Sequence, residues 1–414
     1  MAARLPKRVY LLGWVSLFAD IASEMVYPII PIYITAVLMA QPTVLGLVEG
    51  FSAAIVSFMK GWSGWHSDRS GRRLPYIRWG YALSAIGKPM IAFPGGWPML
   101  FLARATDRLG KGIRTTARDA LIADSVERTQ YGAAFGLHRA MDTTGAFLGG
   151  VLAIVLLILI PGDLRWIFLI AFVPGVLSVL ITFRVKDRDH ETDKKERTFV
   201  KLRDLSPGYW RAVVIALVFG LANSSDTFLL LRANNVFDGV LKGSTTAFQT
   251  LRELFPANHL PLILTTLTYL FYNLFYVLCS YPAGVISDRI GRWKVIGVGW
   301  LLYGAVYLGF AYAGPVSIWL LFGLYGIYIG LADGVGKALV ADHAPPEARG
   351  AALGFYYMAA GFTTIVGNVL AGWLWTRFSP SATFLAGAIL TAVALILIPL
   401  TAPFEREKGP PARV

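Results

Sequence analysis

The sequence predicts an all-α polytopic membrane protein with twelve transmembrane helices in two pseudo-symmetric six-helix bundles. Apolar residues make up 56% of the 414 residues and charged residues only 15%, whereas soluble globular proteins carry about 25% charge. The mean hydropathy is +0.57. Apolar runs of about 20 residues, the length that crosses a bilayer core, recur between Val9 and Ala402. The two halves of the chain also repeat the same motifs.

The first predicted span follows the basic start Met1–Arg8. Its apolar run is longer than the core of a signal peptide and contains Asp20 and Glu24, so we expect a transmembrane helix and not a cleaved signal. Short connectors with turn residues separate the later runs. The twelve predicted helices cover residues 9–37, 43–65, 76–94, 97–117, 130–160, 164–185, 209–233, 260–286, 294–313, 316–342, 350–376 and 380–401.

Lys and Arg gather in alternate connectors, and this asymmetry predicts the orientation of the chain. We expect both termini on the cytoplasmic side of the cell (inner) membrane. The charged segment 186–206 is predicted to be a cytoplasmic linker between an N-terminal bundle over 1–185 and a C-terminal bundle over 207–414. Because the net charge of +13 lies mostly in cytoplasmic connectors, no nucleic-acid partner is expected.

Three motifs of the first half return in the same order in the second half. GWHSDRSGRR at 64–73 matches GVISDRIGRWK at 284–294, ALIAD at 120–124 matches ALVAD at 338–342, and GAAFG at 132–136 matches GAALG at 350–354. Each copy of the first motif lies at a cytoplasmic connector after the second span of its half. The chain therefore reads as two related bundles in parallel, an arrangement found in many secondary transporters.

With these motifs, the sequence resembles the major facilitator superfamily over essentially its whole length. The loop signature of that family, G-x-x-x-D-R-x-G-R-[RK], matches at 64–73 and from 284, where Trp293 displaces the last cation to Lys294. The resemblance implies alternating access, with a cytoplasmic gate that locks the outward-open state. A tight turn with snorkelling arginines accounts for about half of the same composition. The gate residues of the two loops are Gly64, Asp68, Arg69, Gly71, Arg72, Gly284, Asp288, Arg289 and Arg292.

The glycines and the neighbouring acidic residues of this gate allow more specific expectations. Gly64 and Gly284 would allow close helix contact, and Gly71 and Gly291 would allow sharp turns. Acidic residues at neighbouring helix ends are candidate partners for Arg72, Arg114, Arg118 and Arg292, and the pairs stay open. These acids are Asp119, Asp124 and Asp342.

Two further signatures of the family match only in part. Arg108-Leu-Gly110-Lys111-Gly112 has the arginine and the glycines of the fourth-span signature, with Lys111 in the place of a glutamine. Gly145-Ala-Phe-Leu-Gly149-Gly150 resembles the fifth-span motif of drug exporters but lacks its proline. Helix packing explains these glycines at least as well as a role in antiport.

Ionisable residues inside the spans are the strongest pointers to function, because charge within a bilayer is costly. Arg104, Asp107, Arg108 and Lys111 follow i, i+3, i+4, i+7 spacing and share one helix face. Asp107 can neutralise only one of three cations, so this face attracts a counter-charge from another helix or from substrate. We expect Asp20 and Glu24 to line a cavity opposite it, with Tyr27 and two prolines following. The alternative is a permanently paired network that only fixes helix order.

Other candidates depend on weaker patterns. Asp142 lies one turn after His138, beside Arg139, and Asp226 in Asn223-Ser-Ser-Asp226 lies at roughly the position of Glu24 in the repeat. Tyr269 and Asn273 are candidate substrate contacts, although most aromatic residues in such a chain serve packing. Four charged residues near predicted helix ends are explained by snorkelling. They are Glu49, Lys60, Arg78 and Lys88.

The sequence contains neither a Walker motif nor zinc-ligand spacing, so we expect no ATP-driven transport, no cofactor or metal, and no enzyme. The leading hypothesis is a monomeric, proton-coupled antiporter that exports amphiphilic or drug-like compounds. Its proton or ion carriers would be Asp20, Glu24, Asp142 and Asp226. One alternative is proton-coupled uptake of an organic anion such as a carboxylate siderophore or metabolite. The other is a transport-dead membrane receptor. The partial match of Gly145–Gly150 to the drug-exporter motif ranks export slightly ahead of uptake.

Overall fold

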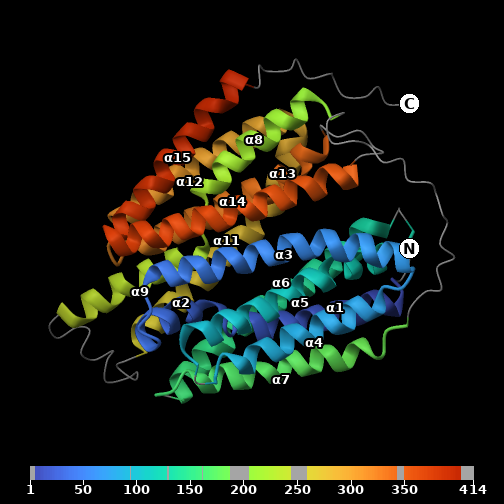
Figure 1. Cartoon of the computed structure of the whole chain (residues 1–414), viewed down its shortest axis with the longest axis horizontal. Helices are drawn as coiled ribbons and strands as arrows, with labels where there is room; N and C mark the ends of the chain where they lie inside the picture. The colour runs from blue at the N-terminus through green and yellow to red at the C-terminus, as the bar shows by residue number, and fades with distance from the viewer. Residues whose placement is uncertain are drawn as a thin grey trace. The chain divides into compact units, whose positions relative to one another are not determined.

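The structure is a computed structural model that describes residues 5–93, 95–127, 130–160, 162–186, 205–243, 259–342 and 349–401. Within these ranges all regular structure is helical, and helices occur where the apolar runs predict them (Figure 1). The chain divides into two compact units. Unit 1 comprises Met1–Glu196 and Ser225–Leu270, and unit 2 comprises Arg197–Ser224 and Phe271–Val414.

Unit 1 is a bundle in which α4 and α3 pack on α5, and α1 packs on α6 and α7. Its elements are α1 (Lys7–Glu24), the short turns η1 (Tyr27–Ile29), α2 (Ile30–Ile32) and η2 (Tyr33–Val37), α3 (Pro42–Ser70), α4 (Leu74–Met90), α5 (Gly96–Ala123), α6 (Tyr131–Leu159), α7 (Arg165–Thr182), α9 (Asp226–Gly243) and the first turns of α11 (Leu260–Ile290).

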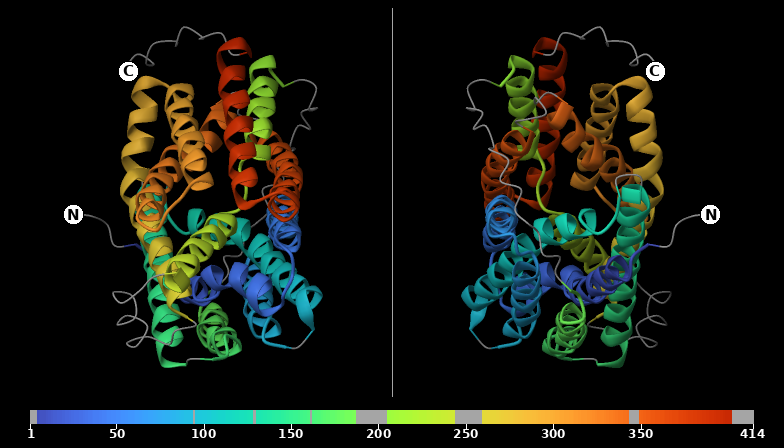
Figure 2. Two further views of the ribbon diagram at one scale, coloured as in Figure 1. Left: turned by 90° about the vertical axis from the view of Figure 1, so that its left-hand side faces the viewer. Right: turned by 90° about the vertical axis from the view of Figure 1, so that its right-hand side faces the viewer.

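Unit 2 has a second set of packed helices, among which α12 packs on α13 and α15, and α8 packs on α14 and α15. The light-green α8 lies beside the red α15 in both views of Figure 2. Its remaining elements are α8 (Pro207–Ala222), the rest of α11, α12 (Arg292–Ala311), α13 (Ser317–Asp342), α14 (Arg349–Arg377) and α15 (Pro380–Thr401).

The first helix of each half is interrupted. After α1 the chain continues in 3-10, α and π turns to Val37, because Pro28 and Pro31 lack the N–H groups of a regular helix. In the second half α8 ends at Ala222, and α9 begins at Asp226. The seventh span was predicted to end at residue 233, but α9 continues to Gly243 because Phe237 and Leu241 are buried there.

The linker predicted at 186–206, between the two bundles, stays a prediction. The packing of the helices shows in addition that a later segment of the chain belongs to unit 1. The described residues 225–243 and 259–270 follow the linker in the sequence, yet they pack with the helices of unit 1. α9 contacts α2, for example. The interruption at 223–225 is therefore also the place where the chain passes from one unit to the other.

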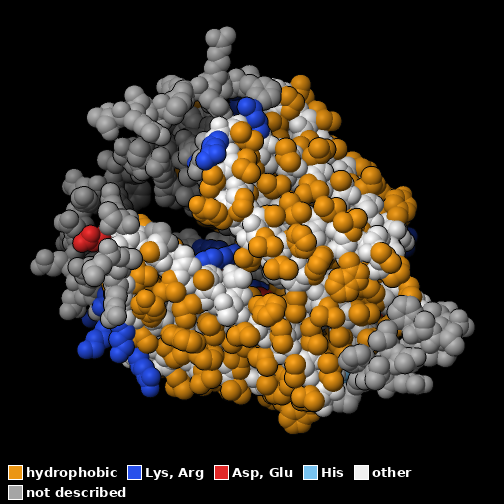
Figure 3. All heavy atoms as spheres, turned by 180° about the vertical axis from the view of Figure 1, so that it is seen from behind, with side chains coloured by type: hydrophobic (Ala, Val, Ile, Leu, Met, Phe, Trp, Pro, Cys, Tyr) orange, Lys and Arg blue, Asp and Glu red, His pale blue; other side chains and the backbone are white. Residues whose placement is uncertain are grey.

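The described surface is apolar, as expected for helices surrounded by lipid. Hydrophobic side chains cover most of the described face seen in Figure 3, and residues such as Leu159 and Tyr312 are 69% and 73% exposed. Nine described helical segments are long and apolar enough to cross a membrane. When α1–η2 and α8–α9 each count as one segment, the described chain has twelve helical segments, which confirms the predicted number.

Glycines set the distance between α6 and α1. A Cβ atom at Gly149 would lie 2.6 Å from the Ile21 carbonyl oxygen, and one at Gly145 would collide with the backbone of Leu17. At Gly136, on the same helix, no atom of the described residues lies within 4 Å of such a Cβ. The glycines at 145 and 149 thus serve contact between α6 and α1.

We predict that Gly149→Val destabilises the protein by about 1–3 kcal/mol, the usual cost of overpacking. Thermal unfolding of the purified protein measures this as a lower Tm. Gly136→Ala is the matched control and should leave the Tm unchanged or raise it slightly. An unchanged Tm in Gly149→Val would show that α6 does not pack this closely on α1.

Candidate functional site

The charged face of α5 lies inside unit 1. Arg104 and Asp107 are 3% and 7% exposed, and the side chain of Arg108 is 15% exposed. The spacing of these residues predicted a shared face, and the partners of each side chain define what that face does. Buried charges in a membrane protein need such partners or water.

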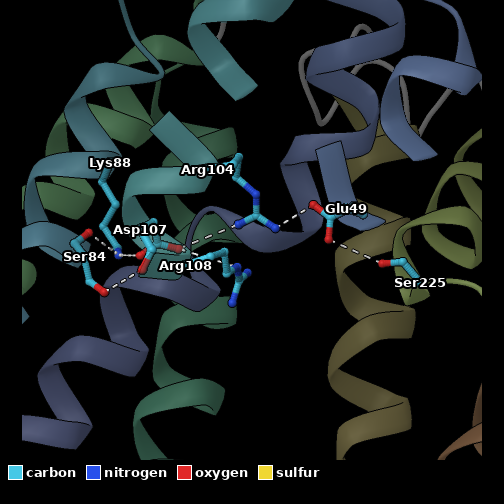
Figure 4. Close-up of polar contacts among 7 residues, drawn as sticks. All are labelled: Glu49, Ser84, Lys88, Arg104, Asp107, Arg108 and Ser225. Atoms are coloured by element: carbon cyan, nitrogen blue, oxygen red, sulfur yellow. Dashed lines mark hydrogen bonds and ion pairs between the residues drawn. The ribbon is translucent and has the colours of Figure 1, made fainter. Parts of the chain in front are cut away.

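Arg104 has its main partner on α3. One of its Nη atoms lies 2.6 Å from Glu49 Oε1, and the other Glu49 oxygen accepts a hydrogen bond from Ser225 Oγ at 3.4 Å (Figure 4). Glu49 is only 6% exposed. The snorkelling prediction is therefore wrong for Glu49, because α3 begins at Pro42 and places this carboxylate two turns inside the helix.

Lys88 on α4 is the second buried partner of the α5 face. Its ammonium donates to Asp107 Oδ1 at 3.1 Å and to the Ser84 carbonyl at 2.9 Å (Figure 4). Lys88 is 3% exposed, so the snorkelling prediction is wrong here also. Gly87 allows this contact, since a Cβ at that position would lie 2.8 Å from the Ala103 carbonyl.

Asp107 is shared among three cations. Besides Lys88, its Oδ2 lies 3.9 Å from Arg104 and 3.7 Å from Arg108. The sequence predicted that this face needs a counter-charge from another helix. The ion pair with Arg104 comes from Glu49 of α3, not from Asp20 or Glu24 of α1. Among the described residues Arg108 has only this pair at 3.7 Å, whereas Arg104 also pairs with Glu49 and Lys88 lies closer to Asp107, so the guanidinium of Arg108 is the least neutralised.

Glu24 lies where α1 is interrupted, next to two tyrosines. The hydroxyl of Tyr269 donates a hydrogen bond to the Glu24 carboxylate, and the Tyr27 and Tyr269 rings are 5.5 Å apart. The Arg104 guanidinium is 5.9 Å from the centre of the Tyr27 ring. The structure thus brings Glu24, Tyr27 and Tyr269 together at the α5 charges.

A second carboxylate group joins α1 to α6. The carboxyl groups of Asp20 and Asp142 are in hydrogen-bonding contact. Ser16 Oγ donates to Asp142 Oδ1 at 2.7 Å, and it accepts from Arg118 at 3.1 Å. Arg139 lies 3.5 Å from the other Asp142 oxygen. A hydrogen bond between two carboxyl groups requires a proton on one of them.

Lys111 interacts with one acid from each of these two groups, Asp20 and Glu24. However, no carboxylate oxygen of the described residues lies within 4.0 Å of its ammonium. His138 precedes Asp142 by one helical turn, is 5% exposed, and has no hydrogen-bond partner for Nε2 among the described residues.

The remaining predicted site residues divide between the two units. Asp226 opens α9 in unit 1, and its charge acts on the Tyr27 hydroxyl. Asn223, at the end of α8, and Asn273, in α11, belong to unit 2.

The two loops that the sequence places on the cytoplasmic side match some of the expectations for their glycines. Gly71 has φ 67° and Gly291 has φ 97°, which confirms the sharp turns. A Cβ at Gly64 would lie 2.8 Å from Thr116, so α3 and α5 approach closely there. At Gly284 a Cβ would meet no atom of the described residues within 4 Å, so the close helix contact expected there stays a prediction.

The charges of these loops are only partly described. Arg73 Nε lies 2.7 Å from Asp124 Oδ2. Arg73 was not among the cations that the sequence suggested as candidate partners of Asp124. Arg69 lies over the ring of Trp65 at 5.6 Å. Arg72 and Arg289 are exposed, and Arg292 is half-buried. The side chains of Asp68, Asp288 and Asp342 lie outside the described residues.

Sequence reasoning missed Glu49, Lys88 and Ser225 as site residues. Both ionisable residues lie within the predicted spans 43–65 and 76–94, six residues from an end of each. Their depth inside an apolar span was the available signal. Ser225 carried no comparable signal, because its contact with Glu49 joins positions 176 residues apart.

A membrane bundle with two related halves and paired charges inside it defines a multi-pass membrane protein of the transporter class. The family model of the Major Facilitator Superfamily matches residues 12–250 and 239–413. An uncharacterized MFS-type transporter of Methanocaldococcus jannaschii is 34% identical over 395 residues, which cover 95% of this chain and 94% of that protein. The chain therefore belongs to the major facilitator superfamily, and it is a transporter of that type.

More distant proteins share the fold. An uncharacterized protein of Mycobacterium bovis is 26% identical over 89% of this chain and 86% of its own length. The nucleoside transporter NupG has a TM-score of 0.77 with 14% identity, over 97% of this chain and 100% of that one. A peptide transporter, POT, solved in complex with sulfate, has a TM-score of 0.71 with 14% identity, over 96% and 94%. At this identity the likeness concerns the fold.

We predict that Lys88→Met destabilises the protein by about 3–5 kcal/mol, because it leaves Asp107 without its nearest cation in a buried site. The measurement is the Tm of the purified protein. Lys242→Met is the control, since Lys242 pairs with Asp238 on the surface at 2.7 Å and exposed pairs contribute only about 0–1 kcal/mol. Equal Tm shifts in the two variants would contradict a buried pair.

Proposed function

We propose that the protein is a proton-coupled secondary transporter, with the transported proton held between Asp20 and Asp142. The hydrogen-bonding contact of these two carboxyl groups is the observation that carries the proposal. Two adjacent carboxylates repel each other when both are ionised, so such a pair holds one proton readily. Ser16 and Arg139 stabilise the negative charge of Asp142, which leaves the proton on Asp20.

Lys111 connects this proton to the substrate. When Asp20 loses its proton, its carboxylate can attract the ammonium of Lys111, with which it already interacts. When Asp20 is protonated, Lys111 and the weakly paired Arg108 have more positive charge to offer to an incoming anion. Proton and anion would therefore bind together, which is the thermodynamic requirement of symport. These charges favour an organic anion, such as a carboxylate metabolite or siderophore, moving inward with a proton.

Proton-coupled export of amphiphilic or drug-like compounds is the second candidate. It is favoured by Glu24, which lies beside the rings of Tyr27 and Tyr269. A cationic amphiphile could replace a proton at Glu24 and place its charge over these aromatic rings. Competition between cation and proton for one carboxylate is the requirement of antiport. In this candidate Glu24 is the coupling residue, and Asp226 would act as its counterpart in the second half.

The proposal also includes the orientation of the chain in the membrane and the role of the cytoplasmic gate loops. We place both termini on the cytoplasmic side of the inner membrane and assign the monomer as the transporting unit. The loop charges, including Arg73 with Asp124, would form and break contacts as the cytoplasmic side closes and opens.

We predict that Asp142→Asn lowers proton movement in proteoliposomes at least about tenfold, because the amide removes one member of the proton-holding pair. An external pH dye reports proton uptake on addition of organic acids and proton release on addition of ethidium, a cationic amphiphile. Asp163→Asn, at a carboxylate that is 54% exposed, is the control and should match the wild type. Full proton movement in Asp142→Asn would contradict the assignment.

Lys111→Gln separates the two candidates. For an anion, the KM should rise about tenfold, which corresponds to about 1.4 kcal/mol of binding free energy, and Lys111→Arg should restore most of it. For a cationic amphiphile, Lys111→Gln should leave the KM unchanged, whereas Glu24→Gln should abolish coupling. Uptake assays with radiolabelled organic acids and with ethidium give both values.

A further inference from the structure

A segment from the second half of the sequence is docked on unit 1 by side chains. We define the docking segment as α9 with Ser225 before it, and His259 with the first turns of α11 to Leu270. Ser225 Oγ donates to Glu49 at 3.4 Å, and the Tyr269 hydroxyl donates to Glu24. His259 Nδ1 donates to the Leu157 carbonyl at 3.2 Å.

Close packing accompanies these hydrogen bonds. A Cβ at Gly150 on α6 would lie 2.5 Å from Leu270 Cδ2, so this glycine leaves space for the end of the docking segment. Tyr269, the residue before Leu270, packs its ring on Tyr27 at 5.5 Å. The docked arrangement therefore has contacts to α1, α3 and α6.

The docking segment begins at an interruption of the backbone. Residues 223–225 are not helical, and two adjacent serines in this interruption bind to different units. Ser224 Oγ is 2.8 Å from the Tyr307 hydroxyl within unit 2, whereas Ser225 binds Glu49 within unit 1. Three residues outside the helices can absorb a change of backbone direction, which is what a hinge requires.

The two carboxylates that hold the segment differ in their surroundings. Glu49 is paired with Arg104 at 2.6 Å. Glu24 has no such ion pair among the described residues. Four groups act on it: Tyr269 from α11, Lys111 and Arg108 from α5, and Asp142 from α6. Asp20 lies one turn earlier on α1.

We propose that Tyr269 is a positioning residue that makes docking of this segment depend on the charge of Glu24. The inference rests on the proposed proton coupling. A hydrogen bond to a carboxylate is about twice as strong as one to a neutral carboxyl. Neutralising Glu24 therefore weakens one contact, while the contact of Ser225 with Glu49, which is paired with Arg104, remains. The segment then undocks about the hinge at 223–225.

Pulsed electron–electron distance measurement tests this without any substrate. Spin labels at Asn235 in α9 and Asp163 before α7, both exposed, report the distance between the docking segment and the rest of unit 1. The only native cysteine is first replaced by Cys279→Ser. The wild type should show a single distance at about pH 8 and gain a second, longer one at about pH 5.

Tyr269→Phe should raise the undocked fraction about fivefold at the higher pH and remove most of its pH dependence. Glu24→Gln should give a fraction that does not change with pH. Tyr281→Phe, which deletes a hydroxyl from an 81% exposed residue of the same helix, should behave as the wild type. The proposal is overturned by a wild-type distribution that does not change with pH, or by equal distributions in the two tyrosine variants.

Proton movement and distance together separate the two proposals. If Asp142→Asn stops proton movement but Tyr269→Phe leaves the distances unchanged, the role of Tyr269 is wrong and proton coupling stands. If Asp142→Asn still moves protons while the distances respond to Tyr269→Phe, the docking contact stands and the assignment of the proton to Asp20 and Asp142 is wrong.

Discussion

The cost of ionised side chains away from water constrains the whole of unit 1. Glu49, Arg104, Asp107 and Lys88 come from three helices and are all less than 10% exposed. Each has a partner of opposite charge, and removing one partner would leave a buried charge uncompensated. The pairs therefore fix how α3 and α4 lie on α5. Glycines such as Gly87 on α4 allow the helix backbones to approach closely enough for these pairs to form.

The acids of α1 and α6 are arranged differently. Asp20 and Asp142 face each other, and a serine links Asp142 to Arg118. The first group of charges has matched opposite signs, which suits the permanently paired network weighed as an alternative. The second group has two acids in contact, which suits a proton that comes and goes. We infer that unit 1 combines a fixed scaffold of charges with a separate place for proton exchange, with which Lys111 interacts through Asp20.

The sequence predicted the helices well because apolar length alone decides where a chain can cross a bilayer. The shared face of Arg104, Asp107 and Arg108 was also predictable, since helical spacing is local. Contacts between distant positions were not: Tyr269 meets Glu24 across 245 residues, and no local pattern encodes that pair. Glu49 and Lys88 were misread because nearness to a helix end in the sequence does not reveal that a neighbouring helix buries the charge. The extension of α9 to Gly243 depended likewise on burial of Phe237 and Leu241.

Infrared spectroscopy tests most directly whether one proton lies between Asp20 and Asp142. A protonated carboxyl group has a carbonyl stretch that is separate from the bands of a carboxylate. At neutral pH we predict such a band in the wild type, lost in both Asp20→Asn and Asp142→Asn and kept in Asp163→Asn. Absence of the band from the wild type, or its persistence in both asparagine variants, would contradict a proton shared by this pair.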